Sequence, residues 1–293
     1  MKISDIKEEV RRMAAETEIE IRPVFDEIDR IAQINTEKVM TAFQEHRVSE
    51  ACFAGTTGYG YGDRGREVLD SVTADIFGAE DAVIRHSFAS GTHTLSVMLF
   101  GVLRPGDRVL CATGVPYDTI HSVIGISGSG MGSLKDFGIE FEFVDLKDDG
   151  TVDFAELSRR LESGSYRAVY VQRSRGYTLR PTLTNKIIKQ IADIAHKKAG
   201  IVVMLDNCYG EFVQTIEPSD VGADMIVGSL IKNLGGGLAP TGGYIVGKKA
   251  CIDRCAYRLT APGLGREVGA NLGLMTSFYE GLFMAPSTVA SAL

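Results

Sequence analysis

Short apolar runs alternate with amphipathic stretches along most of the chain, which predicts strands separated by helices. The β-rich runs predict seven strands at Asp81–Arg85, Arg108–Ala112, Glu140–Asp145, Ala168–Gln172, Ile201–Asp206, Met225–Val227 and Gly243–Val246. Helical spacing predicts helices at Gly91–Leu103, Tyr117–Ile126, Asp153–Glu162 and Asn185–Ala199. We therefore expect an α/β fold with a mainly parallel seven-stranded sheet flanked by helices.

Residues 1–48 lack this alternation and are predicted to form an N-terminal helical segment. Apolar side chains recur there at helical spacing, at Ile3, Ile6, Val10, Met13, Val24, Phe25, Ile28, Ile31, Val39, Met40 and Phe43. Pro23 suits the first turn of a second helix, and Asn35 or Thr36 suits the cap of a third. These amphipathic helices predict either a bundle or an arm that packs on a partner subunit.

Charge and cysteine content limit the partners. Among 293 residues, 31 are basic and 38 acidic, a net charge of −7 that argues against nucleic acid as the main partner. No basic run indicates a membrane surface, and no apolar run is long enough to span one. Five cysteines without a CxxC pair are typical of a reduced protein, so we expect a cytoplasmic location and no metal site.

The most informative stretch runs from Asp224 to Tyr244. A short apolar strand there is followed by Ser229, Lys232 and a glycine-rich loop, Gly235–Gly237. A lysine amine attacks an aldehyde when burial lowers its pKa, and Ser229 is placed to contact a phosphate of the same cofactor. The alternative is a surface lysine in a glycine turn.

Two further candidates follow other strands of the predicted sheet. Ser90, Gly91 and Thr92 open a helix after the first strand, where free backbone N–H groups and the helix dipole favour a phosphate. Tyr117 follows the second strand and is placed to stack on a flat cofactor. A plain serine cap and an ordinary packed tyrosine are the alternatives.

Charged residues complete this edge, where α/β folds bind their ligands. Asp206 ends an apolar strand, and such an acid is costly unless it is paired, for example by a protonated pyridine nitrogen. Cys208, two residues later, should point to the same side. Arg173 and Arg175 follow the fourth strand and are candidates for an anionic substrate, unless they lie in a solvated loop. A metal is the rival partner for Asp206, but no cluster of histidines or carboxylates accompanies it.

A glycine-rich segment from Gly55 to Arg66 contains Tyr59, Tyr61 and Arg64. Its glycines exclude regular structure, and its tyrosines and arginines are typical of a ligand-facing loop, with an ordinary exposed loop as the alternative. A Rossmann dinucleotide site does not fit, because no strand precedes these glycines.

The order of these features, a phosphate-binding helix start, a stacking tyrosine, a strand-end acid and a lysine after the next strand, resembles the fold-type I pyridoxal-phosphate enzymes. Ser-Leu-Ile-Lys-Asn-Leu-Gly-Gly-Gly at residues 229–237 resembles the cystathionine/methionine γ-lyase branch, in particular its aluminium-resistance group. The resemblance implies the type I transferase fold, pyridoxal 5'-phosphate as cofactor and an amino-acid substrate whose carbon–sulfur bond is cleaved by β- or γ-elimination.

The same resemblance implies roles for the candidates. Lys232 resembles the lysine that forms the internal aldimine and shuttles protons, Asp206 the partner of the pyridine nitrogen, and Tyr117 the stacking tyrosine. Ser90, Gly91, Thr92 and Ser229 match phosphate ligands. Tyr59, Tyr61 and Arg64 resemble a loop that reaches the phosphate of a neighbouring subunit, which implies a homodimer or homotetramer.

The resemblance also implies a domain division. Residues 49–260 correspond to the cofactor-binding domain, and residues 261–293 to the start of a linker helix that leads to a C-terminal small domain. This domain typically supplies an arginine for the substrate carboxylate, and we expect it to be missing here, with an interrupted helix starting after Pro286. An inactive or scaffolding protein of the same fold, and another type I reaction such as that of an aldolase or transaminase, are the alternative functions.

Overall fold

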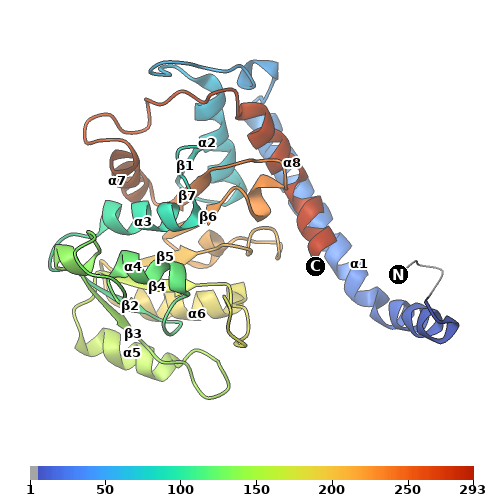
Figure 1. The fold of residues 1–293 in the computed structure, drawn as a ribbon, viewed down its shortest axis with the longest axis horizontal. Coiled ribbons are helices and arrows are strands. Elements are labelled where there is room, and N and C mark those ends of the chain that lie inside the picture. The colour runs from blue at the N-terminus through green and yellow to red at the C-terminus, as the bar shows by residue number, and fades with distance from the viewer. Residues whose placement is uncertain (1–5) are drawn as a thin grey trace.

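A single seven-stranded sheet organises the computed structural model, which describes residues 6–293 (Figure 1). Its strands are β1 Asp81–Arg85, β2 Arg108–Cys111, β3 Glu140–Phe143, β4 Ala168–Gln172, β5 Val202–Asp206, β6 Met225–Ser229 and β7 Gly243–Gly247. Their spatial order is β1-β7-β6-β5-β4-β2-β3, with β7 antiparallel to both neighbours and the other neighbouring pairs parallel. The predicted fold class and the seven strands are confirmed.

Helices cover both faces of this sheet. They are α1 Glu8–Glu45, α2 Arg64–Ile76, α3 Gly91–Val102, α4 His121–Ile124, α5 Phe154–Ser163, α6 Asn185–Ala195, α7 Lys249–Leu259 and α8 Met275–Ala292. Because side chains alternate along a strand, Val203 and Leu205 belong to the hydrophobic cluster on one face, to which α1, α2, α5, α6 and α8 contribute, while Val202 and Met204 belong to the cluster on the other face, to which α3, α4 and α7 contribute. In the part of the chain that is described, no helix is long and apolar enough to cross a membrane.

The N-terminal segment is one long helix, α1, rather than the predicted series of helices. Pro23 lies inside it, on a stretch that is exposed throughout, so water can reach the carbonyl that the proline leaves unpaired. Asn35 is buried and caps no helix, because its Nδ2 donates to the backbone oxygens of Phe212 and Gln214, each at 3.1 Å. Ile3, part of the predicted pattern, lies outside the described residues.

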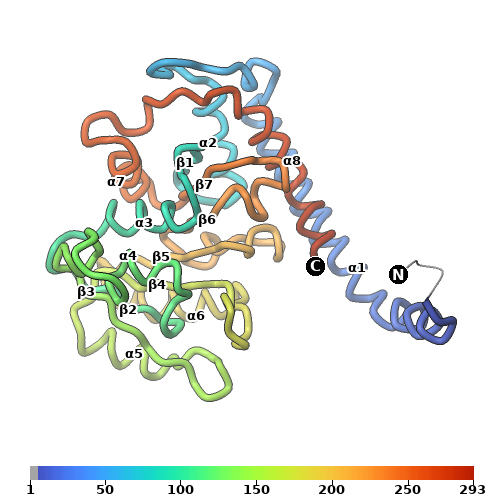
Figure 2. Tube along the Cα trace, in the orientation of Figure 1, coloured from blue at the N-terminus to red at the C-terminus, as the bar shows by residue number. Residues whose placement is uncertain are grey.

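The C-terminal part also differs from the prediction. Helix α8 begins at Met275 and contains Pro286, so the expected helix start after Pro286 is wrong. It runs beside α1, as the trace in Figure 2 shows, and both helices add side chains to the core on the same face of the sheet. The predicted helix at Tyr117–Ile126 is only a short 3-10 turn followed by α4, which Gly125 ends with a φ of 87°. Helices α2 and α7 were not predicted.

Candidate active site

The carboxyl ends of the parallel strands bring several predicted residues to one edge of the sheet. Asp206 is the last residue of β5 and Ser229 the last of β6. The chain leaves β1 at the same edge and enters α3 at Gly91. A methyl group at Gly91 would lie 3.5 Å from Ser229 Cβ and 3.8 Å from Cys208 Sγ, so these three residues surround one small space.

Lys232 lies in the turn after β6 and is partly buried. Its ammonium lies 4.2 Å from the centroid of the Tyr209 ring. Partial burial favours the neutral amine, but the charges of Cys208, Tyr209 and Asp206 outweigh it, and the pKa of Lys232 is raised. The predicted lowering of this pKa is therefore wrong for the protein alone, because acidic neighbours outweigh desolvation.

Asp206 is 1% exposed and only one of its oxygens is satisfied. Oδ1 accepts a hydrogen bond from the Cys208 backbone N–H at 3.1 Å, whereas Oδ2 has no partner among the described residues. Burial raises the pKa of Asp206, against the opposing effects of the Cys208 N–H and the Lys232 charge. A buried carboxylate oxygen without a donor is costly, and a protonated pyridine nitrogen is the kind of group that would satisfy it.

The start of α3 has the features of a phosphate cradle. Ser90 is the N-cap, and its hydroxyl accepts from the His93 N–H at 3.1 Å, so the helix start at Gly91 is confirmed and the serine makes the cap that was the alternative to a phosphate ligand. The Thr92 hydroxyl donates to Thr119 Oγ1 at 3.1 Å. Ser229 Oγ is buried and, among the described residues, makes only a long hydrogen bond of 3.4 Å to the Gly242 carbonyl. The small space beside Gly91 and the free N–H groups of the helix start therefore fit a phosphate.

Tyr117 lies half-buried beside this space. Burial raises the pKa of its phenol, Thr119 opposes this effect, and the charges of Asp206 and Cys208 add to it. Its backbone N–H donates to Oε1 of Gln172 at 2.9 Å. Gln172, which we did not predict as a site residue, thus fixes the position of Tyr117.

The two candidate substrate arginines have different surroundings. Arg173 is 2% exposed, and its guanidinium donates to protein acceptors on Leu183, Asn207, Gly210 and Gln214. Its predicted substrate-binding role does not fit this arrangement, because the internal acceptors already use its donors. Arg175 is exposed, has no hydrogen bond or ion pair from its side chain to the described residues, and lines a cleft of about 500 Å³ together with Tyr117.

Tyr59, Tyr61 and Arg64 are exposed on the surface. The tyrosines are 77% and 63% exposed, with ring centroids 5.9 Å apart. Asp63 fixes this segment, because its carboxylate accepts from the Arg66 N–H at 2.9 Å and from Asn271 Nδ2 at 2.8 Å. Within residues 6–293, no hydrogen bond, ion pair or ring contact joins these three side chains to Lys232.

Sequence reasoning missed Tyr209 as a contact of Lys232, and it missed Glu211 entirely. Both lie in the loop that follows Asp206, and Glu211 is fully buried. Glu211 could have been found from the sequence, because it is a second acid in the short turn that begins at the buried Asp206.

Comparison with known proteins shows the family. A family model described as methionine gamma-lyase matches residues 10–293. The uncharacterized protein YnbB of Bacillus subtilis is 44% identical over 286 residues, which are 97% of this chain and 68% of that protein. The structure of a carbon–sulfur lyase involved in aluminium resistance from Clostridium novyi is 48% identical, with a TM-score of 0.95 over 98% of this chain and 69% of the other.

A more distant structure supports the fold alone. The pyridoxal-5'-phosphate-dependent protein YhfS of Escherichia coli is 19% identical and superposes with a TM-score of 0.67, covering 90% of this chain and 66% of its own. The chain thus spans about two thirds of the length of these relatives. It belongs to the methionine gamma-lyase family, which confirms the predicted class of pyridoxal-phosphate-dependent carbon–sulfur lyase.

Proposed function

We propose that this chain cleaves the carbon–sulfur bond of a sulfur amino acid by β- or γ-elimination. The observation that carries the proposal is the buried, unpaired Oδ2 of Asp206 at the sheet edge that also holds Lys232 and Tyr117. The carbon–sulfur lyase of Clostridium novyi, similar over nearly the whole chain, supports the same chemistry.

The residues present fit pyridoxal phosphate. Asp206 would hold the proton of the pyridine nitrogen, and the Tyr117 ring would stack on the cofactor ring. Ser229, Thr92 and the N–H groups at the start of α3, after Ser90 and Gly91, would hold the phosphate. The buried Cys208 thiol lies beside this space, and the backbone N–H of Cys208 keeps the Asp206 carboxylate oriented.

Bound pyridoxal phosphate supplies an aldehyde for the substrate amine and a ring that delocalises the negative charge left on Cα. The Lys232 amine takes the proton from Cα and carries protons between Cα and the following carbon. Tyr117 protonates the departing sulfur. Overall, the amino acid and one water give a thiol, a 2-oxo acid and ammonia.

Arg175 is the candidate for binding the substrate carboxylate. Its guanidinium is free among the described residues and lies beside Tyr117, in a cleft that opens at the sheet edge. It also lines a second cleft, of about 260 Å³, with Cys208 and Tyr209. An arginine paired with a carboxylate fixes the orientation of the substrate as well as its affinity.

We further propose that the active unit is a homodimer or homotetramer. The exposed Tyr59, Tyr61 and Arg64 would reach the phosphate bound by a neighbouring copy. We also propose that residues 1–48 are a helical segment, residues 49–260 the cofactor-binding domain, and residues 261–293 a separate segment that follows it. The five cysteines are free and buried, which supports a reducing, cytoplasmic location.

The decisive test uses wild type and Lys232→Ala, each incubated with pyridoxal phosphate and then with borohydride. We expect a covalent mass increase on the peptide that contains Lys232 in wild type and none in the variant. A separate sample of wild type, loaded with pyridoxal phosphate but not treated with borohydride, is assayed with cystathionine, methionine and cysteine for thiol, 2-oxo acid and ammonia. Cofactor attachment without turnover would favour an inactive scaffold, and attachment at a different lysine would overturn the assignment of Lys232.

A further inference from the structure

The loop from Asn207 to Phe212 follows Asp206 and contacts the lysine turn through Asn233, and its backbone is unusual. Tyr209 and Phe212 are not glycines, yet they have φ angles of 67° and 60°. Side chains disfavour this left-handed region, so the surroundings must hold the loop in place. The conformation of Tyr209 matters because its ring lies over the Lys232 ammonium.

Glu211 makes hydrogen bonds both to β7 and to the turn that contains Lys232. Its carboxylate Oε1 accepts a hydrogen bond from the Tyr244 hydroxyl of β7 at 2.6 Å. Its backbone oxygen accepts from Nδ2 of Asn233, the residue next to Lys232, at 3.1 Å. Glu211 therefore links the Tyr209 loop, the lysine turn and the sheet.

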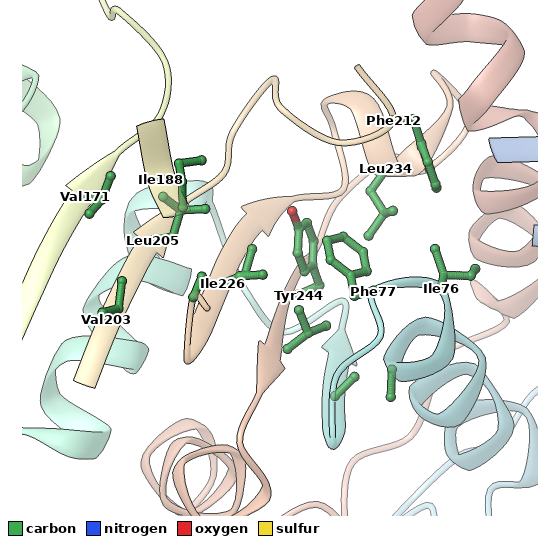
Figure 3. Packing of buried hydrophobic residues seen from close by; sticks show 14 of the residues in the cluster. Ile76, Phe77, Val171, Ile188, Val203, Leu205, Phe212, Ile226, Leu234 and Tyr244 are labelled. Atoms are coloured by element: carbon green, nitrogen blue, oxygen red, sulfur yellow. The ribbon is translucent and has the colours of Figure 1, made fainter. Parts of the chain in front are cut away.

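The sheet leaves room for this contact only because residue 228 is a glycine. A Cβ on Gly228 would lie 2.5 Å from Oε1 of Glu211 and 2.6 Å from the Tyr244 hydroxyl. Tyr244 is fully buried, among Phe77, Ile226 and Leu234 in the view of Figure 3. The partner of Glu211 thus has little freedom to move.

An ordinary buried ion pair does not explain Glu211. The charge of Arg173 opposes the rise that burial causes in the pKa of Glu211, but other acceptors use the donors of Arg173, and no ion pair joins Arg173 to Glu211. The other groups that act on Glu211 are Tyr244 and the carboxyl of Glu217, which accepts from the Phe212 N–H at 3.0 Å. Burial raises the pKa of Glu211 to about 7, which agrees with a carboxyl held without a cation.

We propose that Glu211 is a positioning residue that, through Tyr244 and Asn233, holds the Tyr209 ring over the Lys232 ammonium. Tyr209 in turn stabilises the charged form of Lys232, since a ring face attracts a cation. Glu211 thereby sets how readily the lysine gives up its proton. Any effect of Glu211 on turnover rests on the role proposed for Lys232. The position that Glu211 gives to the Tyr209 ring does not depend on that role.

The test measures Lys232 in the cofactor-free protein. Each variant is treated with limiting acetic anhydride between pH 6 and 10, and acetylation of the Lys232 peptide is followed by mass spectrometry. Glu211→Ala should make Lys232 react about two- to fivefold faster near pH 8, the range expected for loss of one cation–π contact. Glu211→Gln should restore the wild-type rate, since its amide oxygen still accepts from Tyr244. Tyr209→Leu should match Glu211→Ala, and the double variant should show no further increase.

Glu217→Gln is the control for removing a buried acid near this loop, because Glu217 is equally buried, contacts neither Tyr244 nor Asn233, and as glutamine would still accept from the Phe212 N–H. We expect it to leave the reactivity of Lys232 unchanged. Additive effects of Glu211→Ala and Tyr209→Leu, or an equal effect of Glu217→Gln, would overturn the proposal. If Glu211→Ala does not fold, Tyr244→Phe removes the same hydrogen bond and the same outcomes apply. Because this experiment measures no turnover, its result can be interpreted even if the proposed reaction proves wrong.

Discussion

The ammonium of Lys232 lies 4.2 Å from the centroid of the Tyr209 ring, and Tyr209 takes a left-handed backbone conformation to make this contact. The contact stabilises a charged lysine in the protein alone. The cofactor attachment that we propose for Lys232 needs the neutral amine, so in this proposal the loop after Asp206 sets the protonation state from which attachment starts.

The unpaired oxygen of Asp206 predicts the effect of Asp206→Asn. The amide keeps the size of the side chain but cannot hold a proton on a pyridine nitrogen by charge. We expect kcat/KM for elimination to fall by about 100-fold, on the order of a lost charge-assisted hydrogen bond, in steady-state assays with saturating pyridoxal phosphate. Asp193→Asn, on the exposed surface of α6, should change kcat/KM less than twofold, and an equal loss there would contradict the assignment.

The space beside Gly91 predicts that a single methyl group weakens cofactor binding without harming the fold. In Gly91→Ala the new Cβ would lie in ordinary contact with Ser229 and Cys208, so we expect no loss of thermal stability. The methyl group fills part of the phosphate cradle, and the Kd for pyridoxal phosphate should rise about tenfold or more in a fluorescence titration. Unchanged affinity would place the phosphate elsewhere.

Replacing the two arginines after β4 should affect different properties: stability for Arg173 and substrate affinity for Arg175. Arg175→Ala should leave urea unfolding unchanged and raise KM about tenfold, because Arg175 has no structural partner in the described part of the chain. Arg173→Ala should lower the free energy of unfolding by about 3 kcal/mol, since it leaves several buried acceptors unpaired. If the urea midpoint of Arg175→Ala fell as far as that of Arg173→Ala, the division of roles would be incorrect.

Glu211 predicts a pH dependence of stability. Its pKa is about 7 in the folded protein and 4.5 in the reference state, so between these values the folded chain holds a proton that the unfolded chain has released. The free energy of unfolding should therefore fall as pH rises from 4.5 to 7, by roughly 3 kcal/mol from this group, and stay level above 7. Urea unfolding of wild type and Glu211→Gln at several pH values isolates this contribution. Parallel pH curves for the two proteins would show that Glu211 is not protonated in the fold.

Much of the fold could be predicted from local pattern. Apolar runs the length of a strand, separated by amphipathic stretches, specified a parallel α/β sheet because burial on both faces requires such runs. Pattern could not show that Pro23 lies within a helix, because the effect of a proline depends on whether water or protein surrounds it. Nor could it show that Asn35 bonds two carbonyls far along the chain instead of capping a helix.

For the site, the sequence by itself determined which chemical groups lie at the sheet edge, because strand ends and helix starts follow from local pattern. Asp206, Ser229 and the α3 start meet there as expected. Tertiary structure alone decided that the donors of Arg173 are used by internal acceptors, that the Arg175 side chain has no partner among residues 6–293, and that Glu211 lies against Gly228. Burial and hydrogen bonding depend on contacts between residues distant in sequence, and these contacts decide whether a charged group holds the fold together or remains available to a ligand.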